Sequence, residues 1–169
     1  MARGRRPDLV DLRSAPPARR EAILALNARH EVETSPLDAA RLDAMLAAAC
    51  LAPARADGAA FLVAFDELAD YDSPNFAWFR ARLDRFVYVD RVVVSEALRG
   101  RGLARALYAT VLDHARITGR ARVACEVNAV PPNRASDAFH AALGFSEIGR
   151  GAFRADKVVR YLVRGVGGI

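Results

Sequence analysis

A short glycine-rich turn, Arg99-Gly100-Arg101-Gly102-Leu103-Ala104, constrains the fold of this chain more than any other segment. Residues 86–94, directly before it, are rich in β-branched and aromatic side chains, which predicts a buried strand. After the turn, apolar residues recur every four positions from Leu103 to Ala115, as in a helix with one buried face. Gly119 is expected to end that helix. The sequence therefore predicts a tight turn between the end of a buried strand and the N-terminus of a helix.

The backbone of such a turn is suited to bind an anion. The first N–H groups of a helix have no partner within the helix, and Gly100 and Gly102 carry no side chain that would block an approaching group. The helix dipole contributes about 0.3–1 kcal/mol at an exposed site. Arg99, Arg101 and Arg105 add positive charge. We expect this turn to hold a pyrophosphate.

Two common phosphate-binding motifs are excluded. The dinucleotide motif G-x-G-x-x-G requires a third glycine, where this chain has Arg105. The motif G-x-x-x-x-G-K-[ST] requires a lysine after its glycines, and the only lysine of the chain is Lys157.

The turn instead resembles the R/Q-x-x-G-x-G/A signature of the GNAT superfamily of acetyl-CoA-dependent N-acetyltransferases, with Arg99, Gly102 and Ala104 at the defining positions. The later block Asn133-x-x-Ser136-x-x-Phe139-His140-x-x-x-Gly144-Phe145 resembles the second family signature, N-x-x-[AS]-x-x-[FL]-Y-x-x-x-G-F. The resemblance covers nearly the whole chain and is strongest over residues 88–145. Within the superfamily, the chain resembles a bacterial subgroup of predicted acetyltransferases.

The pattern of elements and this resemblance predict an α+β fold with α/β/α layers. Its central sheet is mixed and mostly antiparallel, with one parallel, splayed strand pair and flanking helices. The expected strands cover residues 8–12, 50–56, 59–66, 86–94, 121–127, 145–150 and 158–163. Helices are expected at 17–30, from Ser35-Pro36 to about 49, after Ser73-Pro74, from 103 and at 133–143. Residues 1–7 are expected to be a flexible basic N-terminus, and 8–169 a single N-acetyltransferase domain.

The composition limits the partners that the chain is expected to bind. The formal net charge of +5 comes from arginines scattered along the chain, which is typical of a solvated surface rather than a nucleic-acid site. Cys50 and Cys125 lack metal-ligand spacing, so no metal is expected. No run of 18 apolar residues occurs, so no membrane partner is expected and the protein is expected to be cytoplasmic. An exposed edge strand near the C-terminus can pair two copies as a homodimer.

Amide formation from an amine and a thioester requires a neutral amine. A lysine-like amine is neutral in only about one molecule in two thousand at pH 7, so a general base accelerates the reaction. Two acidic residues interrupt apolar strands: Asp90, expected on one face with Tyr88, Val92 and Val94, and Glu126, expected on one face with Ala124 and Asn128. Both are candidate bases. The alternative for Asp90 is an ion pair with Arg91 or Arg85.

The resemblance implies further roles. An acid at the position of Asp90 is often proposed as the base in this family, and the shorter side chain of Asp90 favours a water relay. The backbone N–H of Val92 would meet the acetyl oxygen, and Val94 would bind the pantetheine arm between strands that diverge beyond Val94 and Val127. The pyrophosphate would contact residues Arg99, Gly100, Arg101, Gly102, Leu103, Ala104 and Arg105.

The second signature implies contacts of Asn133 and Ser136 with CoA. His140 stands where the family has a tyrosine, the proposed acid that protonates the departing thiolate. These three residues are expected to form one helical stripe, opposite Phe139. The alternative is that His140 merely lines the CoA tunnel.

The aromatic segment 71–79 is expected to be a loop with one helical turn. Its aromatic side chains are expected to pin the loop to the core. A compatible interpretation is that the loop forms one wall of a substrate pocket, with Tyr71, Asn75 and Trp78 facing the ligand and Asn128 nearby.

The sequence thus predicts an acetyl-CoA-dependent N-acetyltransferase that acts on a small-molecule or free primary amine by direct attack, with general acid and base help. The missing tyrosine leaves a second hypothesis, a CoA- or acyl-CoA-binding regulatory module without turnover. A third, an arginine-rich nucleic-acid binder, is the weakest of the three.

Overall fold

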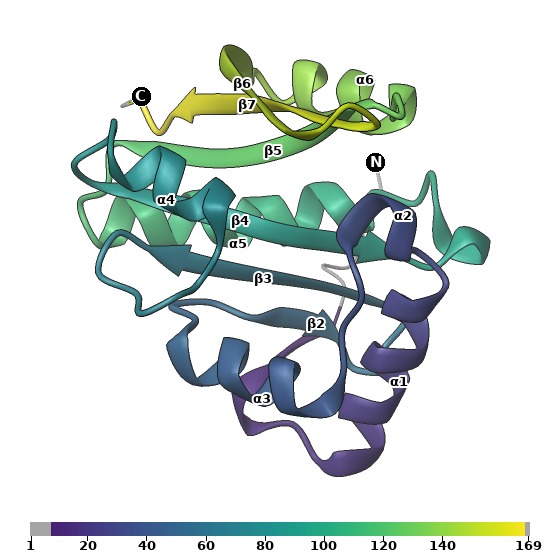
Figure 1. Cartoon of the computed structure of the whole chain (residues 1–169). Helices are drawn as coiled ribbons and strands as arrows, with labels where there is room; N and C mark the ends of the chain where they lie inside the picture. The colour runs from purple at the N-terminus through teal and green to yellow at the C-terminus, as the bar shows by residue number, and fades with distance from the viewer. Residues whose placement is uncertain (1–7, 168–169) are drawn as a thin grey trace, which may run out of the picture.

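A computed structural model describes residues 8–167, which form a seven-stranded sheet with helices on both faces (Figure 1). The predicted basic N-terminus, 1–7, lies outside the described residues, as do 168–169. The strands are β1 (Leu9–Asp11), β2 (Pro53–Arg55), β3 (Ala60–Asp66), β4 (Phe86–Val94), β5 (Arg122–Val130), β6 (Ser146–Arg154) and β7 (Lys157–Gly165). The helices are α1 (Pro17–Ala28), α2 (Glu31–Thr34), α3 (Ala39–Ala48), α4 (Pro74–Arg80), α5 (Leu103–Ile117) and α6 (Arg134–Ala142), with short 3-10 turns η1 (Leu12–Ser14) and η2 (Glu96–Leu98).

The sheet order is β1-β2-β3-β4-β5-β7-β6, and the β4–β5 pair is parallel while the other pairs are antiparallel. This confirms the predicted fold class. Helices α1, α3 and α4 bury one face of the sheet, where Ile23, Leu42 and Phe76 have no exposed surface. Helices α5 and α6 bury the other face, where Leu107 is fully buried against the sheet. Each such large apolar side chain contributes about 1.5–3 kcal/mol through burial.

Strands β4 and β5 part before they end. Their pairing runs from Phe86↔Arg122 to Val89↔Cys125, while β5 continues beside β7 as far as Val130. In Figure 1, β5 bends away from β4 towards their carboxyl ends. The predicted divergence is confirmed, but it begins immediately before Asp90 rather than beyond Val94.

A β-bulge in β4 coincides with this separation. The β3–β4 register shifts between Val63 and Ala64, which pair with Arg91 and Val89, so that Asp90 is an extra residue in β4. A bulge bends its strand and re-aims the side chains that follow.

The bulge overturns the predicted alternation of faces. Val92 and Val94 pack on the α5 side with Val89, whereas Tyr88 lies on the opposite face. The expectation that Asp90 shares a face with Val92 and Val94 is therefore wrong, because one inserted residue reverses the parity of those that follow.

The predicted start of α3 is also wrong. Ser35 ends α2 instead of capping the next helix, with a left-handed backbone at φ 94°. Asp38 caps α3, where its carboxylate accepts the N–H of Arg41 at 2.7 Å. Aspartate and serine are equally good N-caps, and here Ser35 is already used to end α2, so the next helix begins after Asp38.

The predicted cap at Ser73 is confirmed: its hydroxyl accepts the N–H of Phe76 at 3.3 Å, and α4 runs for two turns. Asn133 caps α6 as expected. Within residues 8–167, none of the helices combines the length and apolarity needed to cross a membrane. The same residues hold no cluster of three or more His, Cys, Asp or Glu that could bind a metal ion.

Candidate functional site

The glycine-rich turn leaves its backbone accessible. Gly100 and Gly102 have φ of 75° and 77°, a left-handed conformation that favours glycine, and a Cβ on either would meet nothing within 4 Å. Gly102 precedes α5 as its N-cap. The side chain of Arg99 lies back over the strand end, with Nε 3.4 Å from the carbonyl oxygen of Val94 and Nη2 3.3 Å from Nδ1 of His30.

A cavity of about 350 Å³ opens between this turn, the end of β4 and α6; we call it the turn cavity. Of the residues that the sequence assigned to CoA, it is lined by Val92, Val94, Arg99, Gly100, Ala104, Asn133, Ser136 and His140. Leu103 is buried in the core, while Gly102 and the side chains of Arg101 and Arg105 are exposed and do not line this cavity.

His140 is only 2% exposed, and both of its ring nitrogens have partners. Nδ1 lies 2.8 Å from the carbonyl oxygen of Ser136, which can only accept, so Nδ1 carries the proton. Nε2 then accepts the hydroxyl of Tyr108 at 2.7 Å. Burial lowers the pKa of His140, so the ring is neutral at pH 7. It therefore has no N–H left for a departing thiolate, in contrast to the predicted acid.

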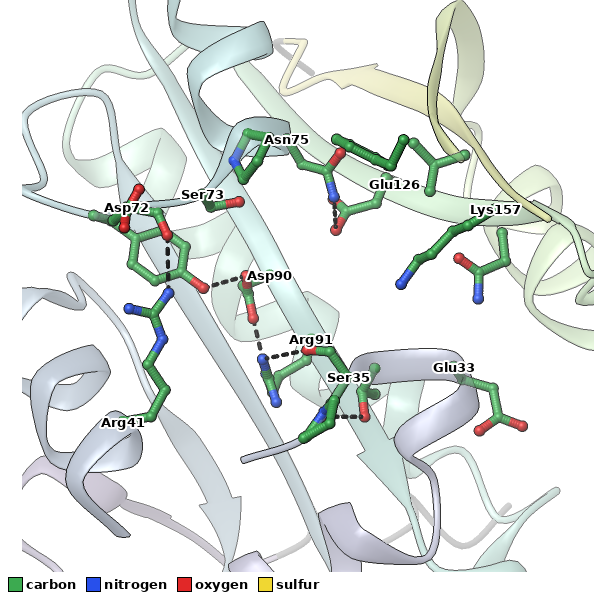
Figure 2. A pocket seen from close by; sticks show the side chains of 17 residues that line it. Glu33, Ser35, Arg41, Asp72, Ser73, Asn75, Asp90, Arg91, Glu126 and Lys157 are labelled. Atoms are coloured by element: carbon green, nitrogen blue, oxygen red, sulfur yellow. Dashed lines mark hydrogen bonds and ion pairs between the residues drawn. The ribbon is translucent and has the colours of Figure 1, made fainter. Parts of the chain in front are cut away.

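A second cavity, of about 510 Å³, lies on the opposite face of β4; we call it the Glu126 cavity. It is enclosed by α2, α4, the end of β5 and the β6–β7 hairpin (Figure 2). The predicted residues Tyr71, Asn75, Asp90, Glu126 and Asn128 all line it. Glu33 and Thr34 line both cavities, so the two spaces share a wall at α2, which Asn128 holds beside β5.

Asp90 is held by the ion pair that the sequence left as its alternative. Its Oδ2 accepts Nε of Arg91 at 2.8 Å and its Oδ1 accepts the hydroxyl of Tyr71 at 2.6 Å. The two side chains of the pair are 8% and 4% exposed. Arg91 also donates to Asn27 at 2.9 Å. Asp90 is thus a partnered carboxylate inside a buried network.

Glu126 is half-buried, and only one of its carboxylate oxygens has partners. Its Oε1 accepts Nδ2 of Asn75 and the hydroxyl of Tyr88, both at 3.0 Å, while Oε2 is buried without a partner among the described residues. Asn75 is itself fixed by the hydroxyl of Tyr161 at 3.0 Å. Burial, followed by the nearby charge of Asp90, raises the pKa of Glu126 to about 8. An orphaned acid with a shifted pKa in a cavity is typical of a functional group.

A profile of the Acetyltransferase (GNAT) family matches residues 23–145, which include the turn, both divergent strands and α6. The chain belongs to this family. It is accordingly an acyltransferase.

Solved structures of other acetyltransferases share the fold. One is the ribosomal-protein-S18-alanine N-acetyltransferase from Escherichia coli, at 15% identity and a TM-score of 0.64, covering 95% of this chain and 94% of that one. Another is a putative acetyltransferase from Salmonella typhimurium with its cofactor acetyl-CoA, at 18% identity and a TM-score of 0.66, covering 95% and 94%. A third is an aminoglycoside 6'-N-acetyltransferase complexed with coenzyme A, at 12% identity and a TM-score of 0.69, covering 95% and 98%. No curated protein sequence matches the chain.

In this acetyltransferase, Trp78 lies away from the Glu126 cavity. It stacks on Tyr161 with ring centroids 4.1 Å apart, and the guanidinium of Arg82 covers it at 4.0 Å. A Cβ on Gly149 would approach the Trp78 ring to 2.6 Å, so β6 needs a glycine there. Trp78 thus pins α4 to the sheet, as in the first interpretation of the aromatic segment, and does not form a wall of the Glu126 cavity. Asn128 does line the cavity, and it also donates to the carbonyl oxygen of Val32 at 3.1 Å, which holds α2 beside β5.

Sequence reasoning missed several polar residues of the Glu126 cavity, among them Glu33, Arg41 and Lys157. Glu33 belongs to the short helix α2, which no sequence pattern indicated. For Lys157 a signal existed, because it is the only lysine among many arginines.

Tyr108 is expected to stabilise the acetyltransferase through His140. In Tyr108→Phe, Nε2 of the buried imidazole loses its donor, which should lower the free energy of unfolding by about 1–3 kcal/mol. Urea unfolding measures this in a double-mutant cycle, in which Tyr108→Phe should cost less in a His140→Phe background than in the wild type. An equal cost of Tyr108→Phe in both backgrounds would contradict the hydrogen bond between Tyr108 and His140.

Proposed function

We propose that this acyltransferase moves an acetyl group from acetyl-CoA to a primary amine by direct attack of the amine on the thioester. The observation that carries the proposal is a pair of cavities that share a wall at α2, one next to the glycine-rich turn and one around Glu126, on a strand β4 whose pairing with β5 has ended. The CoA and acetyl-CoA bound to two of the structural neighbours support the choice of thioester. The neighbours named for a protein alanine and for an aminoglycoside support an amine acceptor.

The turn cavity has the groups that the thioester needs. The N–H groups of the turn and the side chain of Arg99 would hold the pyrophosphate. Beyond Val89, β4 lacks its β5 partner, so backbone groups on that edge are free to pair with the pantetheine arm like an added strand. At the far wall, Nδ1 of His140 donates to a carbonyl oxygen, which leaves the hydroxyl of Ser136 to donate to the leaving sulfur.

Glu126 is the base in this proposal. Its free Oε2 can accept a proton from the amine as the new C–N bond forms and the C–S bond breaks. A carboxylate with a pKa of about 8 is matched to an α-amine, whose pKa is also near 8. Asp90 has both oxygens engaged, so its role is to position Arg91 and Tyr71 in the wall of the cavity.

Asp90→Asn is expected to cost more in stability than in chemistry. Removing one charge of a buried ion pair leaves Arg91 without its counterion, and such losses cost about 3–5 kcal/mol. The amide oxygen of asparagine can still accept one hydrogen bond, so the loss of stability should lie at the lower end of this range. Thermal unfolding and kcat measured on the folded variant check the prediction. A kcat lower than that of Glu126→Gln would make Asp90 the base instead.

Thiol release from acetyl-CoA across a panel of primary amines tests the function itself. We expect turnover with at least one small amine, with the acetylated product confirmed by mass. Binding of acetyl-CoA without thiol release from any amine would favour the regulatory module, and salt-dependent retention of nucleic acid without either would favour the nucleic-acid binder.

A further inference from the structure

Lys157 is an unpartnered cation in the wall of the Glu126 cavity. It opens β7, lines the cavity, and its ammonium points into the open space in Figure 2. Within residues 8–167, no hydrogen bond or ion pair involves this ammonium. The two arginines of the same cavity are both engaged: Arg91 with Asp90, and Arg41 with the carbonyl oxygen of Asp72 at 2.9 Å and with the Tyr71 ring at 5.0 Å.

Glu33, Asp72, Asp90 and Glu126 are the acids that line the cavity, and Glu126 is the one on the strand next to that of Lys157. On β5, Glu126 and Asn128 pair with Tyr161 and Val159 of β7, and Lys157 continues the same face of β7 two residues further. Val130 of β5 pairs with Val158, the neighbour of Lys157. Glu126 lies four residues before Val130, which is about 13 Å along the strand at about 3.3 Å per residue. The long lysine stem shortens this gap without closing it, since the two groups form no ion pair. A small ligand fits between them.

The charges of the cavity therefore suit a dipolar ligand. Its amine would meet the free Oε2 of Glu126, and an anionic group two or three bonds away would meet the ammonium of Lys157. Apolar surface from Pro36, Phe153 and Val159 lines the same cavity and can accept a side chain. We propose that the acceptor is an amine that carries a carboxylate, such as a free amino acid, and that Lys157 selects it by binding the carboxylate. This inference rests on the function proposed above.

Matched acceptors test the proposal. Each set holds an amino acid, its amide and its decarboxylated amine: alanine, alaninamide and ethylamine; leucine, leucinamide and 3-methylbutylamine; phenylalanine, phenylalaninamide and phenethylamine. In the sets that turn over, wild-type kcat/KM should favour the carboxylate by about 10–100-fold, the range of a charge-assisted hydrogen bond. Lys157→Met should abolish this preference by raising KM, and Lys157→Glu should reverse it in favour of the amine. Arg122→Met, which removes an exposed cation at the start of β5, is the control and should behave as wild type.

A second measurement does not depend on turnover. N-acetylleucine should raise the melting temperature of the wild type more than N-acetylleucinamide does, and Lys157→Met should remove the difference. Equal use of acids, amides and amines, or a carboxylate preference that survives Lys157→Met, overturns the role of Lys157 while the proposed function stands. If no amine is acetylated, the proposed function fails. If N-acetylleucine and N-acetylleucinamide then also raise the melting temperature equally, the carboxylate-binding role of Lys157 is overturned as well.

Discussion

Replacing Glu126 by glutamine is expected to lower kcat for amine acetylation by about 10²–10⁴-fold, the usual contribution of a general base. The amide keeps an oxygen that can accept from Asn75 and Tyr88, so the side chain should stay in place. The substitution removes the proton acceptor, which is the unpartnered Oε2 of the carboxylate. Because Glu126 lines the Glu126 cavity and not the turn cavity, the dissociation constant of acetyl-CoA should not change. Steady-state kinetics and calorimetry with acetyl-CoA measure the two quantities.

The pH dependence separates a base from a binding group. A base works in its ionised form, so kcat should rise with pH up to about 8, the pKa of Glu126, and then level off. The acceptor for this experiment should be an amine that is already neutral at about pH 6, so that its own ionisation does not contribute. In Glu126→Gln the rise should disappear. A rise that persists there, or one that is lost in Asp90→Asn instead, would contradict the assignment.

Stability gives an independent check on the same group. The folded protein raises the pKa of Glu126 above its unfolded value of 4.5, so the folded state holds a proton that the unfolded state releases. The free energy of unfolding should therefore fall as pH rises from about 4.5 to about 8. Glu126→Gln has no carboxyl group to titrate at this position and should not show this fall. Its free energy of unfolding should therefore increase relative to that of the wild type between about pH 4.5 and about pH 8.

The local signals of the sequence predicted much of the fold. The turn at Gly100 and Gly102, the caps at Ser73 and Asn133, and the breaks between elements follow from backbone preferences, which act over a few residues. The parallel pair followed from the handedness of a strand–helix–strand unit.

The details of the site depended on contacts between distant residues. A single inserted residue at Asp90 reversed the faces of Val92 and Val94, and such a bulge leaves no mark on a run of valines. The ring of His140 is fixed by Tyr108, which comes from another helix. Both acids were predicted as candidate bases, but only the three-dimensional network shows that Asp90 is paired and that Glu126 has a free oxygen.

The strongest effect on cofactor binding is expected from Ala104→Glu. Ala104 is the second residue of α5 and lines the turn cavity. A carboxylate in the first turn interacts favourably with the helix dipole, by about 0.3–1 kcal/mol, so the melting temperature should stay the same or rise. The same carboxylate would occupy the space of the pyrophosphate and repel it, while competing for the N–H groups of the turn. With charge-assisted hydrogen bonds worth about 1.5–3 kcal/mol each, we expect the affinity for acetyl-CoA to fall at least about 10²-fold.

Two matched variants separate charge from size and position. Ala104→Gln adds nearly the same volume without the charge, and it should lose less affinity than Ala104→Glu. Ala109→Glu places the same charge on an exposed position of α5 outside the turn cavity, and it should bind acetyl-CoA as wild type does. The loss in Ala104→Glu should also shrink as salt is added, because screening weakens the repulsion at about 0.1 M and above. Unchanged affinity in Ala104→Glu at an unchanged melting temperature would mean that the pyrophosphate binds elsewhere, and the assignment of the turn cavity to acetyl-CoA would then be wrong.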